Sequence, residues 1–160
     1  MTNISFSNWI KWTDRNKLIG INYPGIYIIA ISDNDFSSQN FEWVKEISYV
    51  GMTNSKGGLK SRLQQFDNTI YGKTGHGGAD RFRYKYQNYQ DIVNKLYVSV
   101  CTFVCDVESN EAKDWRIMGE VAQLEYKCIA KYIEIFHELP EFNDKKKSVK
   151  YSLTNKNRGL

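Results

Sequence analysis

The sequence predicts one α+β domain in which helices flank a small antiparallel sheet of three strands. Three apolar or alternating runs, at residues 26–31, 42–53 and 95–107, have the β-branched and aromatic content of strands. Two patterns with helical spacing lie between and after them, at residues 58–66 and 112–137. A chain of 160 residues, with 41% hydrophobic and 25% charged residues, is long enough to bury one real core.

The composition excludes several other classes of protein. The N-terminus has no charged segment followed by an apolar one, and no run approaches the roughly 18 apolar residues of a membrane span. We therefore expect a cytoplasmic protein without membrane contact. The three cysteines, Cys101, Cys105 and Cys128, form neither a Cys-x-x-Cys nor a Cys/His pattern. We interpret them as buried apolar residues in a reducing compartment.

The first elements follow from turn chemistry and periodicity. Residues 5–15 begin with Ser and Asn and carry aromatic or aliphatic side chains at helical spacing, so they predict a short amphipathic helix packed on the sheet. The turn Tyr23-Pro24-Gly25 leads into the strand at 26–31, whose β-branched run suits burial on both faces. A polar loop, residues 32–40, returns the chain to the strand at 42–53, antiparallel to the first.

Two charged side chains stand out on the predicted helices. In the helix at 58–66, Arg62 lies beside the buried face that Leu59, Leu63 and Phe66 form. In the helix at 112–137, Glu125 falls inside the apolar stripe, whereas Glu120 lies on the outward side. A buried ionised carboxylate costs several kcal/mol of desolvation, so Glu125 needs a partner such as a metal ion or Arg62. A pairing with a lysine at the edge of the stripe is the alternative.

Positive charge is concentrated in two segments, although the net charge is only +4. Residues 71–87 hold four Lys/Arg against one acidic residue, and residues 144–160 hold six against one. This distribution is typical of a surface that meets a polyanion. Glycines followed by alternating basic and aromatic residues suit phosphate neutralisation and base stacking. The alternatives are a hairpin at 71–87 and a solvated basic tail. The candidate nucleic-acid contacts are Lys73, Arg81, Arg83, Lys85, Lys145, Lys146 and Lys147.

A series of motifs in fixed order runs from residue 25 to residue 143. It comprises Gly25-Ile26-Tyr27, Tyr49-Val50-Gly51, Arg62, Glu125-Tyr-Lys-Cys-Ile129 and Leu139-Pro-Glu-Phe-Asn143. This series resembles the motifs of the GIY-YIG nuclease family. The resemblance implies the fold of that family for residues 1–143, with 144–160 as a basic tail. It also implies an active site of Tyr27, Tyr49, Arg62, Glu125 and Asn143 around one divalent metal, Mg²⁺ or Mn²⁺, bound by Glu125.

Two positions, His76 and Asn143, each admit more than one interpretation. Many members of the family carry a histidine one turn beyond the arginine, where this chain has Gln65 and Phe66. His76, in the glycine-rich segment, is a candidate to supply the imidazole as a base, a phosphate donor or a proton shuttle. A solvated loop histidine is the alternative. Asn143 follows Leu139-Pro140, so it either braces the site or only turns the chain.

The chemistry of these residue types suits phosphodiester hydrolysis. That reaction needs an activated water, a cation at the phosphoryl oxygens and help for the leaving oxygen. Glu125 offers a hard oxygen ligand to a hydrated magnesium ion, and Arg62 offers paired hydrogen bonds to phosphate. A nearby metal and arginine favour phenolate, so Tyr27 or Tyr49 is able to take the proton of the water. The residues leave open which tyrosine does so.

These observations predict a metal-dependent endonuclease acting on double-stranded DNA. Because 160 residues leave little space for a separate recognition domain, we expect a restriction-type or mobile-element defence enzyme. One site in each subunit would require a homodimer to cut both strands. The first alternative is a nucleic-acid-binding module of the same fold that has lost catalysis. The second is an unrelated aromatic-rich interaction domain, in which Glu125 would pair with a lysine.

Overall fold

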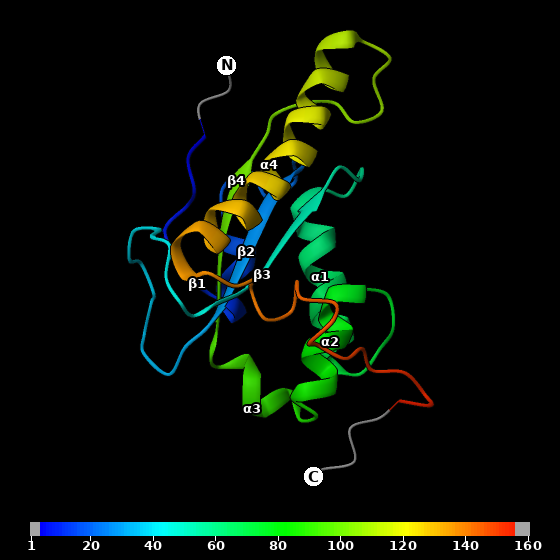
Figure 1. Ribbon diagram of the computed structural model, residues 1–160. Helices are drawn as coiled ribbons and strands as arrows, with labels where there is room; N and C mark the ends of the chain where they lie inside the picture. Colours follow the sequence, from blue (N-terminus) through cyan, green and yellow to red (C-terminus); the bar gives the residue numbers. More distant parts are fainter. Residues whose placement is uncertain (1–3, 156–160) are drawn as a thin grey trace.

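The computed structural model describes residues 4–155 and shows an α+β domain of three layers (Figure 1). The central layer is an antiparallel sheet in the order β1 (Ile10–Lys11), β4 (Leu96–Thr102), β2 (Gly25–Ile31) and β3 (Ile47–Thr53). Around it lie the 3-10 helix η1 (Trp12–Lys17) and the α-helices α1 (Gly58–Tyr71), α2 (Gly77–Lys85), α3 (Tyr89–Val93) and α4 (Ala112–Phe136). No helix within residues 4–155 is long and apolar enough to cross a membrane.

The sheet has four strands, so the expectation of three was wrong by one. The extra strand, β1, lies inside the segment 5–15 that was expected to be a helix, and only η1 after it is helical. The side chains of Trp9 and Trp12 explain the difference. Trp9 packs in the core on one face of the sheet and Trp12 in the core on the other. In a helix their spacing of three would have placed them on one side.

The central strand β2 is buried on both faces, as its sequence predicted. Tyr27 and Ile29 pack towards α1 and α2, whereas Ile26, Ile28 and Ala30 pack towards α4. Antiparallel pairing sets Tyr27 opposite Gly51 and Ile29 opposite Tyr49. Both tyrosines of the two triplets therefore lie on the same face of the sheet.

The glycine-rich segment does not form the hairpin considered above. Residues 77–85 form α2, in which the buried residues Ala79 and Phe82 are three positions apart. The Phe82 ring packs 4.9 Å from Phe66 and 4.0 Å from Phe142. The alternation of basic and aromatic residues fits a strand equally well. Burial of Phe82 in this aromatic cluster stabilises the helix instead. The helix predicted at 112–137 is confirmed as α4.

Candidate active site

A cleft of about 460 Å³ opens along β3. Its lining combines β3, α1, the start of α2, α4 and the segment after residue 138. Four of the six predicted catalytic residues line it, namely Tyr49, Arg62, Glu125 and Asn143. The other two, Tyr27 and His76, are buried behind Tyr49, with each ring centroid 6.0 Å from that of Tyr49. Residues far apart in the chain thus meet at one place.

Glycines make room for both tyrosine rings. A Cβ at Gly51 would lie 2.4 Å from Cζ and Oη of Tyr27. A Cβ at Gly78, at the start of α2, would lie 2.5 Å from Cζ and Oη of Tyr49. Non-bonded carbon atoms do not approach so closely. The position of the Tyr27 ring therefore requires glycine at position 51.

His76 connects Tyr27 to helix α2. Its Nδ1 accepts hydrogen bonds from the backbone N–H groups of Gly78 (3.1 Å) and Ala79 (3.2 Å), so that His76 is the N-cap of α2. Its Nε2 lies 2.7 Å from Oη of Tyr27. Because Nδ1 accepts, the proton of the neutral ring is on Nε2 and is donated to Tyr27.

The environment keeps the His76 ring neutral. Only 1% of the residue is exposed. Burial, and then the charge of Arg62, lower the pKa of His76 from 6.5 to about 3. Both ring nitrogens are occupied and the ring is buried, so the alternative of a solvated loop histidine was wrong. This arrangement suits a residue that positions Tyr27 and leaves no lone pair on the ring for a general base.

The tyrosines differ in how they meet the cleft. Tyr27 is fully buried, whereas Tyr49 is partly exposed and lines the cleft. Burial raises the pKa of Tyr27 well above its ordinary value, and the neighbouring Tyr49 adds to the effect. Burial also raises the pKa of Tyr49, and the carboxylate of Glu125 contributes in the same direction. Both hydroxyls therefore keep their protons at neutral pH in the protein alone.

Arg62 presents an unused hydrogen-bond donor. It extends from α1 into the cleft, and its Nη1 donates to Oε1 of Gln65 at 3.2 Å. Its Nε is buried and has no hydrogen-bond partner within residues 4–155. A buried guanidinium donor without an acceptor is unfavourable. The guanidinium as a whole lines the cleft, where it offers a charged donor to an anion.

Glu125 extends from α4 into the same cleft and is half-buried. Burial raises the pKa of its carboxyl group, although Arg62, the backbone N–H of Met52 and the charge of Lys145 act to lower it. In the described part of the chain Glu125 forms no ion pair, so the alternative of a simple lysine pair is absent there. Its carboxylate therefore lines the cleft without a cationic partner of its own among the described residues.

The fit to a divalent metal rests on Glu125 alone. Within residues 4–155 no group of three or more His, Cys, Asp or Glu side chains is arranged to hold a metal ion. A hydrated Mg²⁺ needs only one or two carboxylates together with substrate phosphate oxygens. A partly desolvated carboxylate without an ion-pair partner matches that requirement.

Asn143 is bound to the backbone of β3. Its Oδ1 accepts from the N–H of Val50 at 2.8 Å, and its Nδ2 donates to the carbonyl of Val50 at 2.9 Å. The backbone N–H of Asn143 donates to the carbonyl of Pro140 at 3.0 Å, so the residue is also part of a turn. With its amide engaged on Val50, Asn143 braces the strand that carries Tyr49.

The predicted nucleic-acid contacts separate into two groups. Arg81, Arg83 and Lys85 contact the C-terminal part of the chain, through Ser148, Tyr151 and Glu141 respectively. Lys73, Lys145 and Lys146 are exposed, and of these Lys145 lines the cleft. Lys147 lines a different cleft. Lys150, which sequence reasoning did not select, also lines the cleft of Glu125. Only its place in the basic tail pointed to it.

Comparison of the chain with protein-family models, with curated proteins and with solved structures gives no match.

Proposed function

We propose that this protein is a metal-dependent endonuclease with the GIY-YIG nuclease fold, which hydrolyses phosphodiester bonds of double-stranded DNA. The observation that carries the proposal is the meeting of Tyr49, Arg62 and Glu125 at one cleft, with Tyr27 held behind them. A restriction-type or mobile-element defence enzyme is the role we favour. Because each chain has one such site, a homodimer would cut both strands.

The charge of the cleft supports an anionic substrate. Within residues 4–155 its lining contains the cationic side chains of Arg62, Arg81, Lys145 and Lys150, and a single carboxylate, Glu125. Such an excess of positive charge attracts a polyanion. The guanidinium of Arg62, which lines the cleft, gives a specific contact point for a phosphate oxygen in addition to this general attraction.

Each residue has a role that follows from its position. Glu125 would hold Mg²⁺ or Mn²⁺, which when bound neutralises charge on the phosphoryl oxygens and acidifies water. Arg62 binds and orients the phosphate. Tyr49, which is exposed to the cleft, contacts the attacking water or the phosphate. The hydroxyl oxygen of Tyr27 accepts the hydrogen bond of His76, so its own proton points away from the imidazole ring. Tyr27 is then a hydrogen-bond donor that orients its neighbours in the site.

The test is cleavage of supercoiled plasmid and phage DNA with Mg²⁺ or Mn²⁺, with a chelator control. We compare the wild type with Glu125→Ala and with Glu134→Gln, a control at an exposed position of the same helix. Discrete fragments from the wild type and Glu134→Gln, absent for Glu125→Ala, would support a sequence-specific nuclease. Salt-sensitive DNA binding without cutting by any of the three would favour the binding module that has lost catalysis.

A further inference from the structure

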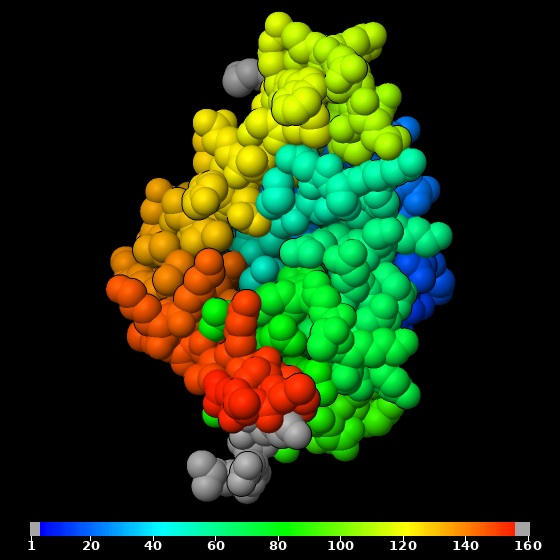
Figure 2. Space-filling model, turned by 90° about the vertical axis from the view of Figure 1, so that its right-hand side faces the viewer, coloured from blue at the N-terminus to red at the C-terminus, as the bar shows by residue number. Residues whose placement is uncertain are grey.

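The segment of residues 144–152, here called the C-terminal strap, lies along helix α2 (Figure 2). Two arginines of α2 hold it. The Nη1 of Arg81 donates to the backbone carbonyl of Ser148 and, at 3.2 Å, to its Oγ. The guanidinium carbon of Arg83 lies 3.6 Å from the centre of the Tyr151 ring, a cation–π contact. The backbone N–H of Tyr151 donates to the carbonyl of Asp80 at 2.9 Å.

The docked strap places Lys150 at the cleft of Glu125. The Nζ of Lys150 lies 3.0 Å from the position that a Cβ on Gly77 would occupy, so the missing side chain makes room for it. Lys150 lines the cleft together with Arg62, and its charge helps to lower the pKa of His76. Within residues 4–155 Lys150 forms no ion pair, and its side chain is exposed.

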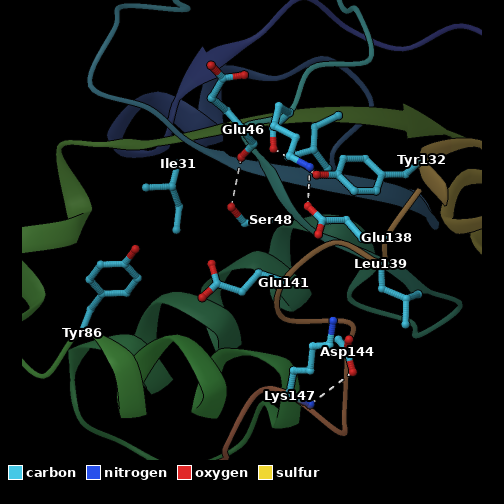
Figure 3. A pocket seen from close by; sticks show the side chains of 12 residues that line it. Ile31, Glu46, Ser48, Tyr86, Tyr132, Glu138, Leu139, Glu141, Asp144 and Lys147 are labelled. Atoms are coloured by element: carbon cyan, nitrogen blue, oxygen red, sulfur yellow. Dashed lines mark hydrogen bonds and ion pairs between the residues drawn. The ribbon is translucent and has the colours of Figure 1, made fainter. Parts of the chain in front are cut away.

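Arg81, Arg83 and Lys147, which are also cationic, differ from Lys150 in their contacts. Arg81 and Arg83 are engaged in holding the strap. Lys147, three residues before Lys150, lies at a separate cleft beside Glu141 and Asp144, and its backbone N–H donates to Asp144 (Figure 3). These two lysines of equal charge thus lie in different surroundings. The cleft of Lys150 also holds Arg62, Arg81 and Lys145 beside Glu125. Burial raises the pKa of the nearby Asp80, and the charge of Lys150 acts to lower it. The cleft of Lys147 holds mainly carboxylates, with Lys45.

We propose that the C-terminal strap is part of the substrate site and that Lys150 is a phosphate-binding residue, delivered to the cleft by the docking of the strap on α2. The ligand class is a backbone phosphodiester of the nucleic acid, so this inference rests on the proposed function. The arginines of α2 then act mainly by holding the strap, and Lys150 joins Arg62 and Lys145 as cations available to the phosphate in the cleft.

The test uses a Glu125→Gln background, in which binding is read without cleavage. Fluorescence anisotropy of a labelled DNA duplex gives the Kd over salt concentrations from about 50 to 200 mM. Lys150→Gln should weaken binding about threefold to tenfold and lower the salt slope by about one. Lys147→Gln removes the same charge at a predicted contact that lies outside the cleft of Glu125, and it should weaken binding clearly less than Lys150→Gln does.

A third variant tests delivery by the strap. Tyr151→Ser removes the ring on which Arg83 stacks. It should weaken binding as Lys150→Gln does, and the double variant should be no weaker than either single variant, because both act through one contact. Circular dichroism verifies that each variant is folded. Additive losses in the double variant would contradict delivery by the strap.

The remaining outcomes are also decisive. Equal effects of Lys150→Gln and Lys147→Gln would mean that the strap acts only through diffuse charge. An unchanged Kd for Lys150→Gln would show that Lys150 is not part of the substrate site. Either result overturns this inference and leaves the nuclease proposal standing. Absence of DNA binding by the wild type would overturn both. Binding that depends on Lys150, in a wild type that cuts no DNA, would support this inference and contradict catalysis.

Discussion

The hydroxyl of Tyr27 and Nε2 of His76 are 2.7 Å apart, and the other ring nitrogen of the same histidine caps helix α2. One imidazole therefore fixes both a helix and a tyrosine. The two roles are separable by substitution, since asparagine is a good N-cap but is too short to reach the tyrosine.

His76→Asn should retain most of the stability and lose activity. Asparagine keeps a cap for α2 but removes the hydrogen bond to Tyr27, whereas His76→Ala removes both. We expect His76→Ala to be less stable than His76→Asn by about 1 kcal/mol, the typical contribution of an N-cap. Urea denaturation gives the stabilities, and plasmid cleavage should fall by about tenfold or more in both variants. Full activity of His76→Asn would show that Tyr27 needs no partner.

The low pKa of His76 predicts a characteristic pH dependence of stability. The folded protein holds His76 with a pKa of about 3, below the ordinary 6.5, so below about pH 6.5 the unfolded state binds more protons. The stability that the neutral His76 contributes to the folded protein is complete above pH 6.5 and is lost as the pH falls towards 3. The free energy of unfolding decreases through this group by up to about 1.4 kcal/mol for each pH unit.

The variant His76→Asn isolates that contribution. Burial raises the pKa of both Glu125 and Asp80, which favours the folded state on acidification and opposes the effect of His76. The difference in free energy of unfolding between wild type and variant cancels those carboxyl groups. It should shift in favour of the variant as the pH is lowered from about 7 to 5. A difference independent of pH would contradict the buried neutral histidine.

Gly51→Ala and Gly78→Ala should each disturb one tyrosine. The added methyl group would overlap the ring of Tyr27 or of Tyr49, at about 2.4 to 2.5 Å. We expect destabilisation by about 1–3 kcal/mol, as for other overpacked sites, together with loss of cleavage. The control is Gly119→Ala in α4, where a Cβ meets nothing within 4 Å. There alanine should stabilise the helix by about 0.5–1 kcal/mol. Thermal unfolding measures all three.

Asn143→Asp should weaken the attachment to β3. The carboxylate accepts from the N–H of Val50 but has no donor for the Val50 carbonyl, which Nδ2 of Asn143 now binds at 2.9 Å. The loss should be about 1–3 kcal/mol. Asn88→Asp is the matched control, because Asn88 caps α3 through its acceptor oxygen alone and Asp caps equally well. Equal stability of the two variants would argue against the brace.

The sequence predicted the elements whose signals are local. The β-branched run of β2 and the apolar stripe of α4 were confirmed, and the position of Glu125 within the stripe predicted that it faces other elements. The ends of the strands were less accurate. Residues 42–46 were included in the second strand, but β3 begins at Ile47, since a strand ends where its partner ends.

The features that the sequence did not predict depend on distant partners. A strand of two residues such as β1 exists only because β4 lies beside it. The burial of Arg81 depends on Ser148, and the burial of His76 depends on Tyr27 and on the first turn of α2. Local patterns contain no information about such contacts, so the sequence did not predict that Arg81 and Arg83 of α2 contact the C-terminal part of the chain.

The bond between Asn143 and Val50 has a consequence for assembly. It occupies backbone groups that β3 would otherwise offer to another strand, and the N–H of Phe142 binds the carbonyl of Ser48. At the opposite end of the sheet, the backbone of Trp9 is bonded to residues 38 and 39. These bonds leave fewer backbone groups at the borders of the sheet free for edge-to-edge pairing with another chain.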